Sequence, residues 1–500
     1  MSKTVEYNIN QFGGGISDSP RKPAVNEFQL SKHFDIFTDP FRLIPYRSLE
    51  ADTETSVSTT DLKQYVVKDF VYATTSSKLY GLGNNGSLTQ IVQKANAVSG
   101  LWEVPALSLG NGAVQNGCFF EFQDYLWGFQ GTNQIFKYGL LSGSPSITNT
   151  ATGGTVGATI TSVADGLIAA DGNAYLAYNN VIVRISSGLT ITDSAKTVPS
   201  NYKITSLANY GSYMAIAAAP ISTFNGESKV FIWNLSSDLF QDSIDWGEGD
   251  LRVLETIEGM LVGVTDRYLN NSTGAGRGSM IIQVYSGGSP QVVKEVFTQA
   301  LTGKTMPTSK AVKNNRLFFT CKIMENSAGT EYIEGLWSFG RKNSSYPFVL
   351  TCDIVCEEAN TSGFQGFDTA ANYFFIAHSN DGSVSKTNDA STFAYTSSYD
   401  SQIFDGGDVD SDKQLASCKL SVRKLATGET ATLKYRIDGA TSFTTIGSIT
   451  TVGDISRTFI NIESTGADLP SGKEWEFQIT STGGAEITGF KPKFVINDNI

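Results

Sequence analysis

Short apolar segments recur in pairs along most of the chain, and this repeat constrains the fold more than any other feature. The first members lie at residues 70–75, 124–129, 174–178, 212–218, 259–265, 316–321 and 372–378. The second members lie at residues 78–83, 134–140, 181–186, 229–235, 280–286, 335–340 and 383–388. Turn-forming residues separate the segments, as between short strands. Spacings of about 40–55 residues between equivalent strands are typical of propeller blades.

The repeat therefore predicts an all-β fold, with a β-propeller of about seven blades in residues 65–404. A blade has four strands, and each apolar pair would form its inner hairpin. Closure into a ring leaves no long sheet edge open to aggregation. A series of β-sandwiches would give a similar number of strands and stays open as the alternative.

The two ends of the chain differ from this repeat. Residues 11–20 are glycine-rich, and residues 34–48 contain two prolines, which resist helices and central strands. We expect residues 1–64 to form an extended N-terminal arm along the body or along a neighbour. Near the other end, Cys418, Leu420 and Val422 alternate with polar residues. Such strands bury one face, so residues 405–500 are predicted to form a separate β-sandwich.

Composition narrows the classes of ligand and compartment. The formal net charge of −12 argues against duplex DNA as a direct ligand. It suits a surface that DNA passes without binding, and it also simply keeps a large protein soluble. The five cysteines are scattered and odd in number, which indicates folding in a reducing compartment. No leader-like or membrane-spanning apolar stretch is visible, so we expect synthesis in a cytosol without membrane insertion.

Histidines and cysteines give little sign of a reactive site. His33 and His378 are the only histidines and stand apart, which disfavours a Ser-His-Asp triad or a histidine-rich metal site. Cys352 and Cys356 are spaced four apart in an apolar stretch, unlike a zinc or redox CxxC pair. We expect them to be buried free thiols.

A run of carboxylates before the predicted sandwich is a candidate calcium site. It consists of Asp405, Asp408, Asp410 and Asp412. However, Lys413 and Lys419 stand where an EF-hand loop carries its glycine and its distal glutamate. The favoured interpretation is a solvated linker.

A second acidic segment lies beside an aromatic side chain. Asp245, Glu248 and Asp250 surround Trp246, as carboxylates do in a glycosidase subsite. Gly and Asp are also ordinary turn residues at the edge of a blade, which is the favoured interpretation. Overall, the sequence predicts no catalytic residues, no cofactor and no bound metal.

Three segments resemble structural proteins of tailed-bacteriophage virions. NQFGGGISDSP, followed by NEFQLSKHFDIFTDPFRLIPYRS, is similar to the N-termini of tail and tail-junction proteins. FIWNLSSDLFQDSIDWGEGD looks like a propeller blade of such proteins. GGDVDSDKQLASCKLSVRK with LKYRIDGATSFTTIGSIT is similar to their C-terminal sandwich, which starts here at Gly407, Asp408 and Lys413. The residues that match in the first segment are Phe12, Gly13, Gly14, Asn26, Phe34, Asp35, Pro40, Leu43, Pro45 and Arg47.

Among such proteins, the nozzle or knob proteins of short tails carry propellers and form rings around the DNA channel. The resemblance implies a homo-oligomeric ring, commonly six-fold, docked on an adaptor or another tail protein. DNA would pass through it without specific binding. The expected location is the virion tail, after synthesis in the host bacterial cytoplasm. The candidate interface residues are Phe12, Gly13, Gly14, Asp35, Pro40, Leu43, Pro45 and Arg47.

Three long polar loops offer a further candidate contact surface. They span residues 219–228, 266–278 and 322–332, whereas the first three hairpins have short loops. Equivalent hairpins of a propeller emerge on one face, so these loops would form one patch for another virion subunit or a surface ligand. They are equally well explained as tolerated insertions.

Two other functions compete with the tail ring. A receptor- or glycan-binding propeller on the virion surface would use exposed aromatic side chains. Its candidates are Trp233, Trp246 and Trp337, which are better explained as blade core. A glycosidase or depolymerase is the third possibility, and the sequence lacks its paired carboxylates and its motifs.

Overall fold

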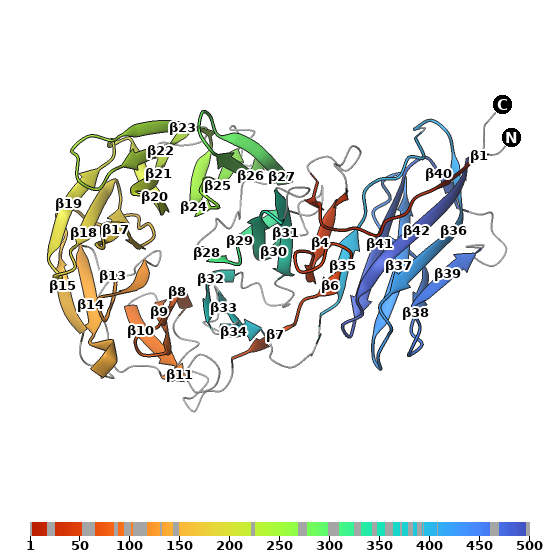
Figure 1. Cartoon of the computed structure of the whole chain (residues 1–500), viewed down its shortest axis with the longest axis horizontal. Helices are drawn as coiled ribbons and strands as arrows, with labels where there is room; N and C mark the ends of the chain where they lie inside the picture. The colour runs from red at the N-terminus through yellow and green to blue at the C-terminus, as the bar shows by residue number, and fades with distance from the viewer. Residues whose placement is uncertain are drawn as a thin grey trace. The chain divides into compact units, whose positions relative to one another are not determined.

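A computed structural model of the chain consists almost entirely of β-strands (Figure 1). It describes residues 3–17, 26–52, 66–84, 89–94, 102–103, 118–130, 133–143, 150–221, 226–268, 278–298, 310–324, 332–342, 348–355, 364–370, 373–378, 384–387, 393, 395–407, 409–460 and 470–496. The helical content of these ranges is one 3-10 turn, η1 (Leu141–Gly143). No helix within them is long and apolar enough to cross a membrane.

The chain divides into two compact units, and each is made of separate stretches of sequence. The first unit combines residues 1–48, 336–355 and 388–500. The second combines residues 49–335 and 356–387. These bounds differ from the expected arm, propeller and sandwich at 1–64, 65–404 and 405–500. The difference arises because N-terminal segments pair with strands that come much later in the chain.

The second unit begins with five four-stranded antiparallel sheets, each formed by consecutive strands. The first contains β8 (Val66–Ala73), β9 (Lys78–Asn84), β10 (Thr89–Lys94) and β11 (Trp102–Glu103); the second contains β12 (Phe119–Phe122), β13 (Tyr125–Gln130), β14 (Gln134–Gly139) and β15 (Thr150–Thr155). The third contains β16 (Leu167–Ile168), β17 (Ala174–Tyr178), β18 (Val181–Ile185) and β19 (Ile191–Thr197); the fourth contains β20 (Tyr202–Tyr210), β21 (Tyr213–Pro220), β22 (Glu227–Trp233) and β23 (Asp242–Glu248). The fifth contains β24 (Asp250–Ile257), β25 (Met260–Tyr268), β26 (Gly278–Tyr285) and β27 (Gln291–Thr298).

The unit is completed by a hairpin and by a sheet that uses an early strand. The hairpin pairs β28 (Lys310–Lys313) with β29 (Arg316–Met324). The next strand, β30 (Tyr332–Gly340), crosses the sequence boundary between the two units. The closing sheet contains β32 (Phe364–Ala370), β33 (Tyr373–His378), β34 (Val384–Thr387) and β7 (Leu49–Ala51). Because β7 precedes the first sheet in sequence, the last sheet of the propeller is completed by a strand from an earlier part of the chain.

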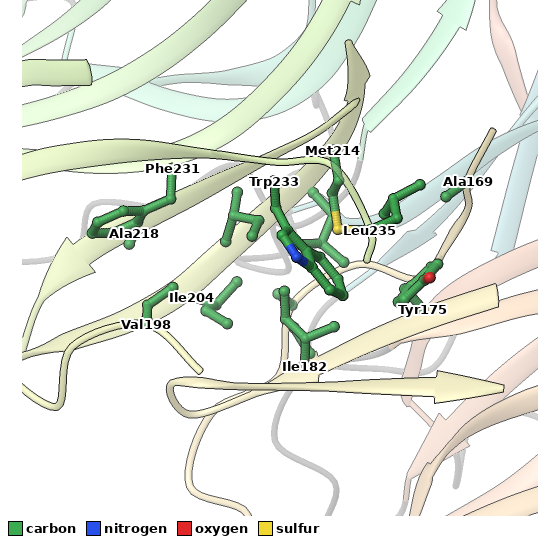
Figure 2. Close-up of a cluster of buried hydrophobic side chains, with 14 of the residues drawn as sticks. Ala169, Tyr175, Ile182, Val198, Ile204, Met214, Ala218, Phe231, Trp233 and Leu235 are labelled. Carbon is green, nitrogen blue, oxygen red and sulfur yellow. The ribbon is translucent and has the colours of Figure 1, made fainter. Parts of the chain in front are cut away.

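Apolar clusters join most neighbouring sheets of the propeller. One cluster packs Tyr175 and Ile182 of the third sheet against Met214 and Trp233 of the fourth (Figure 2). The Tyr175 and Trp233 rings meet edge to face, with their centroids 5.8 Å apart. Similar clusters join the first sheet to the second, the second to the third and the fourth to the fifth. A last cluster joins the closing sheet to the first, so the series returns to its start.

The predicted β-propeller is therefore confirmed, whereas the number of blades, about seven, stays a prediction. The expectation that every pair forms the inner hairpin of its blade is wrong, because most pairs are the two middle strands of their sheets. The segments at 124–129 and 134–140 correspond to β13 and β14, the two middle strands of their sheet. The segments at 70–75 and 78–83 correspond instead to β8 and β9, the first two strands of theirs.

The first unit is a β-sandwich. One sheet has the order β1 (Lys3–Glu6), β42 (Ile487–Ile496), β36 (Lys413–Val422) and β39 (Ser456–Ile460), and β40 (Ser471–Gly472) also pairs with β36. The other contains β31 (Val349–Val355), β4 (Leu30–Lys32), β35 (Ser397–Asp400), β41 (Trp475–Thr482), β37 (Thr430–Ile437) and β38 (Thr444–Ile449). Two short pairs, β2 (Gly15–Ile16) with β3 (Glu27–Phe28) and β5 (Phe34–Asp35) with β6 (Ile44–Pro45), complete the unit.

Aromatic side chains fill the space between the two sheets. Trp475 and Phe477 of β41 contact Phe490 and Phe494 of β42, with ring centroids 5.5–6.2 Å apart. The alternating residues that predicted the sandwich, Cys418, Leu420 and Val422, are buried on β36 of the same unit. The N-terminal residues belong to the same unit, since β1 pairs antiparallel with β42 from Lys3 opposite Ile496 onward.

Candidate functional site

Most of the candidate interface residues in the N-terminal segment lie in the interior of the first unit. Phe12 is completely buried, with its ring 5.3 Å from that of Tyr399. Its N–H donates to the carbonyl of Pro40 at 2.7 Å. Gly13 is buried beside it, and Leu43 forms a backbone bridge with Ile487. These contacts give the motif a role in folding the sandwich.

A second group of motif residues shapes the turns around this interior. A Cβ atom on Gly14 would lie 2.5 Å from the backbone of Asn26, so only glycine fits. The carboxylate of Asp35 accepts the N–H groups of Phe37 and Thr38 at 2.8 and 3.1 Å. Pro45 is buried on β6, whereas Arg47 is exposed. Of the eight candidates, Arg47 is the one that is exposed.

The structure also places the other residues that the sequence singled out. His33 is buried and stacked on Tyr395, with centroids 4.8 Å apart.

Asp405, Asp410 and Asp412 belong to no metal-holding group of three or more His, Cys, Asp or Glu residues among the described ranges. Asp408, Cys356 and the greater part of the three long loops lie outside those ranges. Cys118, Cys321, Cys352 and Cys418 are buried free thiols, as expected for Cys352.

The acidic segment beside Trp246 does not form a subsite. Trp246 is 1% exposed, so its ring is unavailable for stacking on a sugar. Asp245 pairs with Lys229, and Asp250 pairs with Arg252, so two of the carboxylates have cationic partners. Glu248 is exposed at the end of β23.

His378 forms a hydrogen-bonded pair with a serine on the neighbouring strand. Its Nε2 lies 2.9 Å from the Oγ of Ser385, and both side chains are buried. Its Nδ1 has no hydrogen-bond partner within the described part of the chain. The pair therefore lacks the carboxylate that orients the histidine of a catalytic triad.

A polar cluster that the sequence did not predict lies along the inner strands of the propeller. It consists of Asp69, Cys118, Asp165, Ser206, Glu255, Lys310 and Asp368, and we call it the inner-strand cluster. Figure 1 shows β8, β20, β24, β28 and β32, the first strands of their groups, around the middle of the ring. The cluster thus draws on most of the sheets of the propeller.

Lys310 is the cation of this cluster. Its Nζ donates to the Ser206 hydroxyl at 3.0 Å and to the Leu207 and Leu254 carbonyls at 2.6 Å each. Two carboxylates complete its surroundings, Asp165 at 3.1 Å and Glu255 at 3.2 Å. Burial lowers the pKa of Lys310, but these carboxylates outweigh it and leave the pKa above its ordinary value. The ammonium group thus links β20, β24, β28 and the segment just before β16.

Two carboxyl groups of the cluster have raised pKa values. Burial raises the pKa of Asp368 to about 6, although the N–H groups of Thr369 and Tyr72 lower it in part. Burial also raises the pKa of Asp69 well above its ordinary value, and the charges of Asp368 and Asp165 add to this effect. Burial, with the same acidic surroundings, raises the pKa of the Cys118 thiol. These groups are held in their neutral forms over a wider pH range than usual.

A second buried ionic contact lies where the ring closes. Asp52 follows β7, and both of its carboxylate oxygens lie 2.7 Å from the Nζ of Lys94 on β10. The indole N–H of Trp102 on β11 donates to the same carboxylate at 2.8 Å. The Nζ of Lys386 on β34 lies 3.8 Å away. This cluster ties the closing sheet to the first sheet by charge as well as by apolar packing.

These arrangements are suited to holding strands together. The Lys310 ammonium and the Asp52 carboxylate each have several partners supplied by the chain itself. In some proteins, buried ions with satisfied partners fix the registry of the elements that carry them. One usable signal for them is present in the sequence, namely charged residues inside apolar strands, as Asp69 is within VVKDFVYA.

Comparisons with known proteins are consistent with this fold and go no further. No family model matches the chain, and no curated protein is significantly similar to it in sequence. A virginiamycin B lyase from Staphylococcus aureus is similar in structure at 11% identity, over 68% of this chain and 97% of that one, with a TM-score of 0.41. YCF48 from Cyanidioschyzon merolae is similar at 10% identity, over 65% and 96%, with a TM-score of 0.40. BamB from Moraxella catarrhalis is similar at 13% identity, over 62% and 79%, with a TM-score of 0.35.

Proposed function

We propose that the chain is a structural subunit of a bacteriophage tail, in a nozzle or ring around the DNA channel. It assembles with further copies of itself in a six-fold ring and docks on an adaptor or another tail protein. DNA passes through the ring without specific binding. The chain acts through its surfaces and performs no catalysis.

One observation supports this proposal most directly. Arg42, in the N-terminal segment that resembles tail proteins, pairs with Glu486 at 2.9 Å. Arg423, in the C-terminal segment with the same resemblance, pairs with the other oxygen of Glu486 at 2.6 Å. Two separated stretches that resemble one class of protein therefore meet at one carboxylate in one sandwich. This is expected if both belong to one inherited unit.

The glycan-binding alternative receives no such support. All six tryptophans of the chain are buried, including Trp233, Trp246 and Trp337 at 1–3% exposure. Trp233 and Trp246 belong to apolar clusters between propeller sheets, as expected for blade core, whereas Trp337 lies in residues 336–355 of the first unit. Sugar binding by stacking on tryptophan is thereby disfavoured.

Immunogold labelling tests the proposal. Antibodies raised against the purified chain would be applied to intact virions of the phage whose genome encodes it, and to virions of an unrelated phage as a control. We expect gold particles at the tail, in numbers that fit several copies per virion. Labelling that is absent from the virions, or confined to the lysate around them, would contradict a role in the tail.

A further inference from the structure

The outer face of one sandwich sheet carries an unusual arrangement of lysines. Lys419 of β36 lies directly opposite Lys491 of β42 in the antiparallel register. Lys493 lies two residues further along β42, and all three side chains are exposed. Glu6 of β1 stands opposite Lys493, and Thr458 of β39 stands opposite Lys419. We call Lys419, Lys491 and Lys493 the lysine face.

Such an arrangement is costly within the isolated chain. Like charges directly opposite each other on a sheet repel, because their Cβ atoms are only about 4.5–5.5 Å apart. Neither Lys419 nor Lys491 has an ion-pair partner among the described residues. The net charge of the chain is −12, so a concentration of positive charge is also unrepresentative of its surface. An anionic partner on this face would remove the repulsion.

The propeller carries a matching arrangement of opposite sign. Glu227 of β22 lies directly opposite Glu248 of β23, and both side chains are exposed. Asp242 on the same outermost strand is exposed as well. Lys229 is the nearby cation, but it is paired with Asp245. We call Glu227, Asp242 and Glu248 the acidic edge.

We propose that the lysine face of one copy docks on the acidic edge of the next copy. This inference rests on the proposed function, since it supplies the contact by which copies would form a ring. The two surfaces differ, so the contact is heterologous, and heterologous contacts form a ring where the rotation from one copy to the next closes. Each contact would offset the repulsion within two like-charge pairs, Lys419 with Lys491 and Glu227 with Glu248. Nucleic acid is a poorer occupant, because the negative net charge of the chain repels phosphate.

Charge-reversal variants test this contact in the full-length chain. The first variant carries Lys419→Glu with Lys491→Glu, and the second carries Glu227→Lys with Glu248→Lys. A matched control carries Lys424→Glu with Lys473→Glu, which reverses two exposed lysines outside the lysine face. Association is measured by sedimentation velocity at about 0.05 M and about 1 M salt, where screening is weak and strong respectively.

We expect wild type and control to associate at low salt, and each single-surface variant to associate at least about tenfold more weakly. Mixing the two variants restores association. The glutamates on the lysine face of the first variant then meet the lysines on the acidic edge of the second variant. A chain with all four substitutions associates like the wild type. Unchanged melting temperatures show that each variant is folded.

Carbodiimide coupling gives a second readout. It joins amines to carboxylates that are in direct contact. In a mixture of ¹⁵N-labelled and unlabelled chains, we expect mixed-isotope links from Lys419 or Lys491 to Glu227 or Glu248. A monomeric wild type, association unaffected by the substitutions, or links confined to single chains would overturn the inference. Binding of duplex DNA by the same chains is measured in parallel. If the first variant loses DNA binding but still self-associates like the wild type, the lysine face binds nucleic acid and the inference is overturned. If immunogold labelling places the chain at the tail but one of these results is found, the proposed function holds and only the contact between the lysine face and the acidic edge is wrong.

Discussion

Asp52 and Lys94 form a completely buried ion pair, with both carboxylate oxygens 2.7 Å from the ammonium nitrogen. Asp52 follows β7, the early strand that completes the last sheet, and Lys94 lies on β10 of the first sheet. The pair thus spans the place where the propeller closes. It predicts a stability effect that an ordinary surface ion pair would not have.

Removing one member of this pair leaves the other charge buried without a partner. We expect Asp52→Ala to lower the free energy of unfolding by about 3–5 kcal/mol, because an uncompensated buried ammonium is costly. Urea unfolding of the full chain measures the change. The double variant Asp52→Leu with Lys94→Met should recover most of the loss. Equal stability of Asp52→Ala and wild type would contradict the role assigned to the pair.

The raised pKa of Asp368 predicts how stability depends on pH. Its carboxyl group has a pKa of about 6 in the folded chain, against an ordinary value of 3.8. Between these values the folded chain binds more protons than the unfolded chain, so stability falls as pH rises through that range. At neutral pH the buried charge costs about 2–3 kcal/mol.

The variant Asp368→Asn should remove this part of the pH dependence. Its stability at neutral pH should exceed that of wild type, and its profile between about pH 4 and about pH 6 should be flatter. Urea unfolding at several pH values provides the measurement. The exposed Asp242→Asn serves as the control and should retain the wild-type slope. A wild-type stability that rises across this range would refute the assignment.

Close packing around Gly14 predicts a steric effect. A Cβ atom there would lie 2.5 Å from backbone atoms of Asn26 and Glu27, which cannot move aside as a flexible side chain can. We expect Gly14→Ala to destabilise the chain by about 1–3 kcal/mol. Gly143 has no heavy atom within 4 Å of the equivalent position, so Gly143→Ala should change stability little. Calorimetric melting of both variants distinguishes the two outcomes, and equal melting temperatures would exclude the clash.

The aromatic contact between two sheets provides a packing prediction. Trp233 of the fourth sheet packs on Tyr175 of the third, and both are buried (Figure 2). We expect Trp233→Ala to cost about 3–5 kcal/mol, from lost apolar burial and the remaining cavity. Trp233→Phe should cost less, since a ring still fills part of the space. Denaturant unfolding followed by circular dichroism compares them, and a smaller loss for alanine than for phenylalanine would be inconsistent with this packing.

The parts of the fold that could be predicted from the sequence are those that depend on patterns between near neighbours along the chain. The paired strands of the propeller and the alternating strands of the sandwich follow from apolar periodicity, which reports only on near neighbours along the chain. The N-terminal segment lacked such periodicity, because β4, β5 and β6 have only two or three residues each. Their place in the sandwich depends on partners more than 300 residues away, such as Tyr399 opposite Ser31. No local pattern encodes that distance.

The inner-strand cluster escaped prediction for the same reason. Asp69, Lys310 and Asp368 stand far apart in sequence, and no motif or spacing connects them. Asp69 and Asp368 lie inside short strands and Lys310 begins one, and a charged residue in one short strand does not indicate which distant residue it will meet. Only closure of the ring brings them together. The buried position of Phe12 and Leu43 was likewise invisible, because a motif shows which residues recur and not whether they face another molecule.

A cryo-EM reconstruction of the intact virion tests the central claim most directly. The account predicts a ring of copies of this chain around the axis of the tail, with each propeller edge at Glu227 and Glu248 against Lys419 and Lys491 of its neighbour. Density for the chain as isolated copies away from the tail axis, or a reconstructed tail without it, would contradict the account.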